Sequence, residues 1–207
     1  MTSLTQSSIL LETTIKAVLT KSPEKPATKA VVEALIEQEK TASKLKEPSN
    51  FSQFLGTWRL CFITGTQKTR RQIGTALGPG RYLPNWVKIH LSYSSSSAYY
   101  QPNLEQYFEV GSVENSVKLG GLKLTLSGPV KFQQKKNILA FDFTRMNVLF
   151  FGVKLYDGYI RGGAESEQKF YSDRINKQAF FAYFYIQEKT IAARGKGGGL
   201  ALWGREN

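Results

Sequence analysis

The stretch FLGTWRL (residues 54–60) marks the point at which the residue pattern of the chain changes. Before it, apolar residues recur at helical spacing. After it, they alternate with polar residues, as is typical of strands that bury one face. Trp58 and Leu60 share one face of the strand that we predict over 57–64. This stretch therefore predicts where a helical segment ends and a β domain begins.

The first fifty residues predict a helical hairpin. Apolar side chains over 4–20 fall roughly on one helical face, and SPEKP at 22–26 ends that helix with two prolines. A second apolar stripe follows over 27–46. Both stripes are narrow, so we expect this hairpin, residues 1–50, to pack on the rest of the chain because it is too small to fold alone.

Residues 51–207 predict a mainly β domain. Apolar and polar residues alternate strictly at 87–93, 122–126 and 139–143, and Gly or Pro separates these segments from other candidates. The further strands that we predict cover 105–110, 112–119, 129–134, 147–155, 179–187, 189–193 and 199–204. So many short strands without intervening helices favour a closed antiparallel barrel, and the pattern also fits a sandwich.

The positive charge of the chain belongs to the β domain. The whole sequence carries 28 Lys and Arg against 16 Asp and Glu, a net +12. Residues 1–50 hold seven Lys and six Glu, which leaves 21 basic and 10 acidic residues, a net +11, for 51–207. Such a field attracts anionic surfaces. We predict that two basic patches bring the barrel to an anionic membrane: Lys68, Arg70 and Arg71 in a long loop at 66–84, and Lys131, Lys135 and Lys136.

Catalytic and metal-binding motifs are not recognisable in the sequence, and we expect neither an enzyme nor a cofactor or metal protein. The single histidine, His90, lies on the polar face of an alternating strand, without partners for a triad or a metal site. The single cysteine, Cys61, is predicted to be a small buried apolar residue. RGKGGG at 194–199 resembles a phosphate loop superficially, but the strand-like LALW follows it, so we predict a hairpin turn.

Aromatic residues suggest what the barrel holds. The segment 179–187 is apolar on both faces, which indicates that one face lines the barrel and the other lies under the helical hairpin. The aromatic residues fit either a solid core or a pocket for a lipophilic ligand. For the pocket, the predicted lining residues are Leu124, Phe141, Phe143, Phe181, Tyr183 and Tyr185.

Three segments resemble the plastid lipid-associated protein (fibrillin) family of photosynthetic organisms. FLGTWRLCFIT at 54–64 resembles the strand that opens the family's barrel, and SVENSVKL at 112–119 resembles its central strand. FYIQEKTIAARGKGGGLALW at 184–203 resembles its C-terminal hairpin, with Arg194 and Gly195 at the family's arginine-glycine pair. The similarity covers roughly residues 51–205. Gln187 and Ile191 depart from the family's acidic residue and arginine.

The resemblance implies a lipocalin-like β-barrel that binds lipophilic molecules such as a lipid, a quinone or a carotenoid, without catalysis. It implies peripheral association with thylakoids or lipid globules and a part in protecting photosynthetic membranes. Because no transit peptide is recognisable, we expect a cyanobacterial protein at the cytoplasmic face of the thylakoid or in the cytoplasm; a plant relative would be plastidial. In such barrels Gly56 and Trp58 close one end, and we predict that Arg194 covers the Trp58 ring, with Arg205 as the alternative.

Two other functions fit parts of the sequence. A barrel enzyme resembling bilin lyases would need polar groups inside the barrel, for which Asp142 and Glu109 are the candidates. A nucleic-acid-binding barrel would need exposed aromatic side chains beside Lys and Arg, and the net charge motivates it. We consider nucleic acid the less suitable partner, and predict a lipophilic small molecule and an anionic membrane surface instead.

Overall fold

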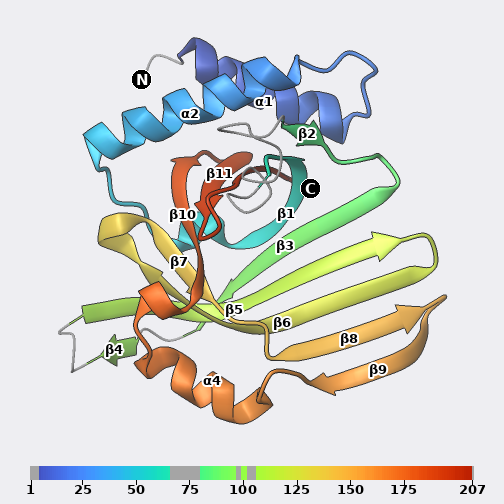
Figure 1. Cartoon of the computed structure of the whole chain (residues 1–207), viewed down its shortest axis with the longest axis vertical. Helices are drawn as coiled ribbons and strands as arrows, with labels where there is room; N and C mark the ends of the chain where they lie inside the picture. The colour runs from blue at the N-terminus through green and yellow to red at the C-terminus, as the bar shows by residue number, and fades with distance from the viewer. Residues whose placement is uncertain (1–4, 66–79, 97–98, 102–105, 207) are drawn as a thin grey trace.

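The computed structural model describes residues 5–65, 80–96, 99–101 and 106–206. Two helices lie over a β-barrel, and a sheet extends from the barrel away from them (Figure 1). The helices are α1 (Gln6–Leu19), α2 (Thr28–Leu45) and α4 (Gly163–Ser172), with 3-10 turns η1 (Phe51–Phe54), η3 (Gln134–Lys136) and η4 (Ile175–Lys177). The strands are β1 (Gly56–Ile63), β2 (Arg81–Tyr82), β3 (Val87–Ser95), β4 (Tyr99–Gln101), β5 (Gln106–Leu119), β6 (Leu122–Gln133), β7 (Ile138–Phe141), β8 (Arg145–Phe150), β9 (Val153–Tyr159), β10 (Ala179–Ile186), β11 (Thr190–Gly195) and β12 (Leu200–Arg205).

Eight antiparallel strands close the barrel. Their order is β5-β3-β1-β12-β11-β10-β7-β6, and the pairing of β6 with β5 completes the ring. The prediction of a mainly β, lipocalin-like barrel after a helical hairpin is confirmed, and the sandwich is excluded. Closure leaves no edge strand within the ring itself.

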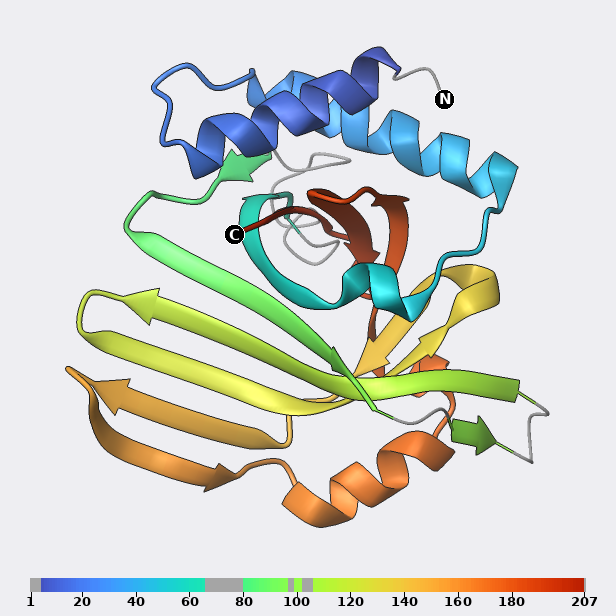
Figure 2. The same cartoon turned by 180° about the vertical axis from the view of Figure 1, so that it is seen from behind.

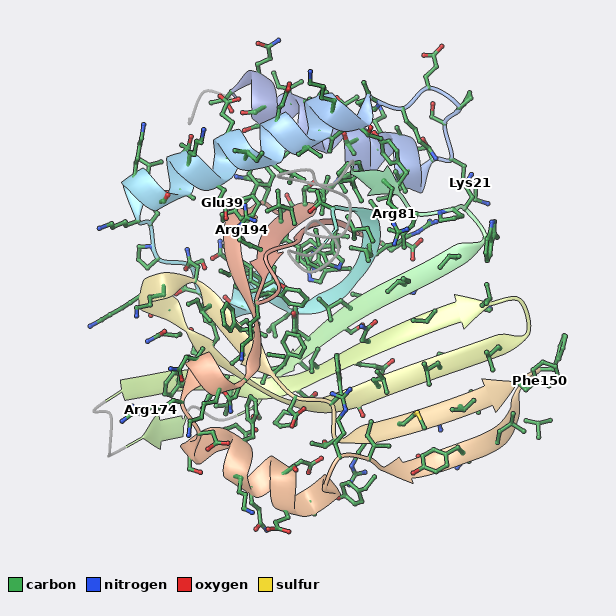
Figure 3. All side chains as sticks on the ribbon, viewed as in Figure 1. Lys21, Glu39, Arg81, Phe150, Arg174 and Arg194 are labelled. Carbon is green, nitrogen blue, oxygen red and sulfur yellow. The ribbon has the colours of Figure 1, made fainter. Side chains whose placement is uncertain are left out.

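The helical hairpin packs on the outside of the barrel. Leu11 and Ile15 of α1 and Leu35 of α2 form one buried cluster with apolar residues of β1, β10, β11 and β12. An ion pair joins Arg194 of β11 to Glu39 of α2, with its Nη2 atom 2.5 Å from a carboxylate oxygen (Figure 3). The apolar stripes of the helices are therefore covered by the barrel, as their narrowness requires.

Strand β6 divides the sheet into two parts. Residues 130–133 lie in the ring and pair with β7, whereas 122–127 pair with β8. At the junction, a Cβ on Gly128 would lie 2.2 Å from the backbone oxygen of Asp142, so only glycine fits there. Beyond this point β3, β5 and β6 continue out of the barrel with β8 and β9 beside them, as Figure 2 shows from behind. We call this extension the flared sheet: residues 87–91, 115–119, 122–126, 145–150 and 153–159.

Three predictions of local structure are wrong. The segment 147–155 is not one strand, because it contains the end of β8, a turn and the start of β9. In that turn Phe151 and Gly152 have φ angles of 46° and 83°. Helix α4 was not predicted, because its single buried large side chain, Phe170, leaves almost no apolar periodicity. The predicted breaks within 105–119 and 122–134 are absent, because β5 and β6 each run through as one long strand.

Candidate ligand-binding surface

Aromatic side chains pack against one another inside the barrel. The 3-10 turn η1 contributes Phe51 and Phe54, both buried, to the same core cluster as Trp58. The Phe54 ring centroid lies 4.5 Å from that of Tyr183 and 5.2 Å from that of Phe132. The segment that joins the helices to β1 thus supplies core side chains that the strand pattern did not reveal.

Four of the six predicted pocket residues belong to this packed cluster. Phe141 stacks on Phe181 at 5.0 Å and contacts Phe143 at 5.3 Å. The hydroxyls of Tyr183 and Tyr93 lie 2.9 Å apart, and burial raises the pKa of both. Each of these side chains fills space against another one, so in this structure they build the core of the barrel.

The other two predicted pocket residues lie elsewhere. Tyr185 faces the helices, with its hydroxyl 3.4 Å from a carboxylate oxygen of Glu12, and burial raises its pKa to about 12. Leu124 lies on the flared sheet, in register with Val117 and Val148. The predicted set is therefore divided among three places: the barrel core, the helix interface and the flared sheet.

The cation that covers Trp58 is Arg205, not Arg194. The Arg205 guanidinium carbon lies 4.0 Å from the Trp58 ring centroid, and its Nη1 donates to the Leu55 carbonyl at 2.8 Å. Arg194 instead donates to Glu39 and to the carbonyl of Gly198. The alternative named in the sequence analysis is thus the correct one, because β12 pairs directly with β1 and places Arg205 opposite Trp58.

Gly56 permits this contact by its lack of a side chain. It adopts a φ of 104°, which other L residues rarely adopt. A Cβ at this position would lie 2.7 Å from Nη1 of Arg205. The Gly-x-Trp of the opening strand is therefore explained by this contact: the glycine makes room for the arginine that covers the tryptophan.

One face of the flared sheet is mostly apolar along five adjacent strands, although Asn115, in register with Leu91 and Leu126, also lies on it. The pairing register aligns Ile89 with Val117, Val117 with Leu124, Leu124 with Val148, and Val148 with Tyr156. The same face continues into the barrel core through Leu91, since it lies two residues beyond Ile89 on β3. All of its members outside the core are partly or largely exposed. We call it the apolar face: Val87, Ile89, Val117, Leu119, Leu122, Leu124, Leu126, Met146, Val148, Phe150 and Tyr156.

The opposite face of the same strands is polar. It carries Lys88, Ser116, Thr125 and Asn147, which alternate with the residues of the apolar face. Helix α4 packs on this outer side, farther along β5 and β6 (Figure 1). The sheet is therefore amphipathic, and its apolar face lies on the same side as the barrel interior.

Lys131 is not a surface residue, contrary to the prediction. Its side chain is fully buried, and its ammonium group donates to the carbonyls of Phe170, Tyr171 and Asp173 at the end of α4. It also lies 5.4 Å from the ring centroid of Phe108. Burial lowers the pKa of Lys131 to about 8. This lysine holds α4 on the barrel, so it cannot meet a membrane.

The remaining predicted basic residues differ in where they lie. Lys135 and Lys136 are exposed on η3, as a surface role requires. Lys68, Arg70 and Arg71 lie outside the described residues. Because Lys131 is buried, only Lys135 and Lys136 remain as exposed, described members of the predicted patches.

Residues with catalytic chemistry are engaged in structural contacts. Cys61 is buried, and burial raises its pKa to about 12, so its thiolate is suppressed. His90 Nε2 lies 2.6 Å from a carboxylate oxygen of Glu206, which also pairs with Arg59 at 3.2 Å. Burial acts to raise the pKa of Glu206, but its bonds to His90 and Arg59 outweigh this and lower it.

The two carboxylates proposed for a barrel enzyme also have local partners. Asp142 accepts a hydrogen bond from the Phe143 amide at 2.8 Å, and Glu109 accepts one from the Phe51 amide at 3.3 Å. In the described part of the chain, no three His, Cys, Asp or Glu residues are grouped as a metal site would need. None of the described helices is long and apolar enough to cross a membrane.

The sequence pattern contained the apolar face without showing that it is open. The alternation at 87–93 and 122–126 correctly predicts an apolar and a polar side for β3 and for the outer part of β6. It does not predict that the partners of these strands end at the barrel and that the apolar side stays partly exposed.

Comparison with known proteins does not assign the chain to a family. No protein-family model matches the sequence, and no curated protein matches it either. Function must therefore be inferred from the barrel, from the flared sheet and from the resemblance of the motifs.

Proposed function

We propose that the protein binds a lipophilic small molecule on the apolar face of the flared sheet and does not transform it chemically. The observation that carries the proposal is an apolar surface that spans five strands, remains partly exposed and joins the barrel core. Proteins rarely expose contiguous apolar surface without a binding role. Half-buried aliphatic side chains suit a lipid, a quinone or a carotenoid-like ligand, because such ligands offer hydrocarbon and few polar groups.

The resemblance to the plastid lipid-associated protein (fibrillin) family supports the same proposal. Gly56 and Trp58 of its opening motif form, with Arg205, the cation–π contact expected beside the first strand of such a barrel, which supports the proposal. By this resemblance the protein acts at photosynthetic membranes, associates with them peripherally, and helps to protect them. The cytoplasmic face of a cyanobacterial thylakoid is the location that we propose.

The geometry favours binding over catalysis. Cys61, His90, Asp142 and Glu109 are each buried or already bonded to a neighbouring group. The apolar face itself presents mostly hydrocarbon side chains, and the Tyr156 hydroxyl, its one titratable group, donates to the Tyr159 carbonyl at 2.9 Å. A ligand held there would be sheltered from water on one side and left chemically unchanged.

Binding of the neutral dye Nile red to the full chain tests the proposal. A neutral probe avoids attraction by the net positive charge. We expect saturable binding with a blue-shifted emission, competed by a plastoquinone analogue or by a neutral lipid. Leu124→Asn should weaken dye binding by roughly tenfold, since a buried Leu is worth about 1.5–3 kcal/mol.

Thr125→Asn is the matched control. It places the same new residue one position along the same strand, on the polar face. It should leave the affinity for Nile red unchanged. Equal losses in the Leu124→Asn and Thr125→Asn variants, or no saturable binding to the unmodified chain, would refute the proposal.

A further inference from the structure

The far edge of the flared sheet exposes large apolar side chains at the start of β3 and at the turns of β5–β6 and β8–β9. Phe151, Trp86 and Val153 are 77%, 68% and 64% exposed, although they are apolar. Pairing places the members in one row: Val87, next to Trp86, faces Leu119; Leu119 faces Leu122; Leu122 faces Phe150; and Phe150 faces Val153. We call this row the apolar rim: Trp86, Leu119, Leu122, Phe150, Phe151 and Val153.

The rim lies at the end of the molecule away from the barrel. Figure 1 shows the turns of β5–β6 and β8–β9 side by side at the free edge of the sheet, and Phe150 is labelled there in Figure 3. The Phe151 amide donates to the Gly121 carbonyl at 2.8 Å, which ties the two turns together. The two hairpin turns of the rim are therefore joined by a backbone hydrogen bond, which fixes their relative positions.

Phe151 is held in an unusual backbone conformation. Its φ of 46° lies in the left-handed region, which costs a non-glycine residue about 1–2 kcal/mol. Folding gains little in return, because most of the side chain faces solvent. A strained and exposed aromatic residue at a hairpin tip points to a role in contact with something outside the chain.

A row of lysines lies one residue behind the rim on the polar face. Lys88 faces Lys118, Lys118 faces Lys123, and Lys123 and Lys154 both face Leu149. Like charges opposite one another on adjacent strands destabilise a sheet. Of this lysine row only Lys154 has a carboxylate partner among the described residues, Asp157 at 3.0 Å. The other three charges are uncompensated there, which indicates an anionic partner.

We propose that the rim inserts into the surface of an anionic lipid bilayer while the lysine row contacts lipid phosphates. Aromatic and aliphatic side chains of interfacial proteins enter the headgroup and acyl boundary to a depth of about 5–10 Å. Tryptophan favours that boundary. A strand advances about 3.3 Å per residue, so lysines one residue behind the rim reach the phosphate level. The role of the rim in ligand uptake rests on the proposed function, because the rim then becomes the route by which a lipophilic ligand reaches the apolar face.

The shape and charge of the edge favour lipid over a protein surface. The rim consists of protruding turns, whereas a stable protein interface needs roughly 800 Å² of matching surface on each partner. A second copy of the chain would bring two lysine rows together. A fluid bilayer accepts protruding side chains without a preformed pocket, and anionic headgroups supply the charge that the lysines lack.

Flotation of the full chain with vesicles tests this inference. The vesicles are an equal mixture of phosphatidylglycerol and phosphatidylcholine, or phosphatidylcholine alone. We expect the unmodified chain to bind the anionic vesicles strongly and the neutral ones weakly. The double variant Trp86→Ser, Phe151→Ser should lose roughly tenfold or more in binding, because each residue buries a large apolar side chain. Both side chains are exposed, so circular dichroism should show an unchanged fold.

Two control variants test whether binding depends on the rim and the lysine row rather than on exposed apolar residues or net charge in general. Ile9→Ser with Leu45→Ser removes two exposed apolar residues of the helices, 52% and 61% exposed, and should not alter binding. Lys118→Gln with Lys123→Gln should weaken binding to the anionic vesicles by about fivefold per residue. Lys135→Gln with Lys136→Gln, which removes equal charge from η3, should have a smaller effect.

The outcomes distinguish this inference from the proposed function. Vesicle binding that is lost in the rim variant while Nile red still binds in solution supports the inference. If the unmodified chain binds vesicles but not Nile red, the proposed function fails and the rim inference stands. If the rim variant floats as well as the unmodified chain, or if the rim only mediates a dimer seen by size-exclusion chromatography, the inference is overturned.

Discussion

Removal of Arg205 should destabilise the barrel more than removal of Arg194. In the Arg205→Met variant the chain loses the guanidinium 4.0 Å from the Trp58 ring, a contact worth about 0.5–2 kcal/mol. It also loses three hydrogen bonds, to the carbonyls of Leu55, Glu188 and Gln53. Only the Leu55 bond is partly buried, and a bond from a charged donor there is worth about 1.5 kcal/mol. The expected loss is therefore about 2–4 kcal/mol.

The Arg194→Met variant is the matched control. It removes a partly exposed ion pair with Glu39, which is worth about 1 kcal/mol or less. Urea unfolding with linear extrapolation measures both losses. A double-mutant cycle with Trp58→Phe then isolates the ring contact: we expect a coupling of about 0.5–1 kcal/mol for Arg205 and none for Arg194. A larger loss of unfolding free energy in Arg194→Met than in Arg205→Met, or a coupling of Arg194 with Trp58, would refute this account of the Arg205–Trp58 contact.

Two further predictions concern Lys131 and Gly128 of β6. Because burial lowers the pKa of Lys131 from 10.5 to about 8, the unfolded chain binds more protons between those values, and this residue makes stability rise with pH there. We expect the unfolding free energy of the unmodified chain minus that of the Lys131→Met variant to increase by about 1.5 kcal/mol from pH 8 to 9.5. Taking this difference cancels the titration of Cys61, which acts in the opposite direction. A difference that does not change with pH would contradict the buried charge. Gly128→Ala should destabilise the chain by about 2 kcal/mol or more, because its Cβ would lie 2.2 Å from a backbone oxygen, and Gly195→Ala, with its nearest atom at 3.7 Å, should cost less than half as much by the same urea assay.

Much of the fold could be predicted from local patterns. The prolines at 22–26 and the apolar stripes beside them place the two N-terminal helices, and alternation places the strands of the barrel. Turn residues mark the β11–β12 hairpin, where Gly195 donates to the Gly199 carbonyl. These features depend on neighbours close in sequence, and local propensity and periodicity therefore suffice to predict them.

The functional surface was harder to predict, because periodicity shows which side chains share a face but not what covers that face. Phe141 and Leu124 both alternate as buried strand residues do, yet one lies in the packed core and the other on the partly exposed apolar face. Lys131 was predicted to be exposed, because a lysine in an alternating strand normally faces solvent. Helix α4, which had no clear sequence signal, covers it and supplies three carbonyls.

By itself the sequence determined a helical hairpin, a mainly antiparallel β domain and the strand that opens it at FLGTWRL, because each depends on spacing along the chain; closure of the barrel, which excludes a sandwich, depends on the pairing of β5 with β6. Only the tertiary structure decided that Arg205 covers Trp58, that Phe51 and Phe54 fill the barrel, and that the apolar residues of the flared sheet remain partly uncovered. Those outcomes depend on which strands become neighbours and where their partners end, and that information lies in long-range pairing.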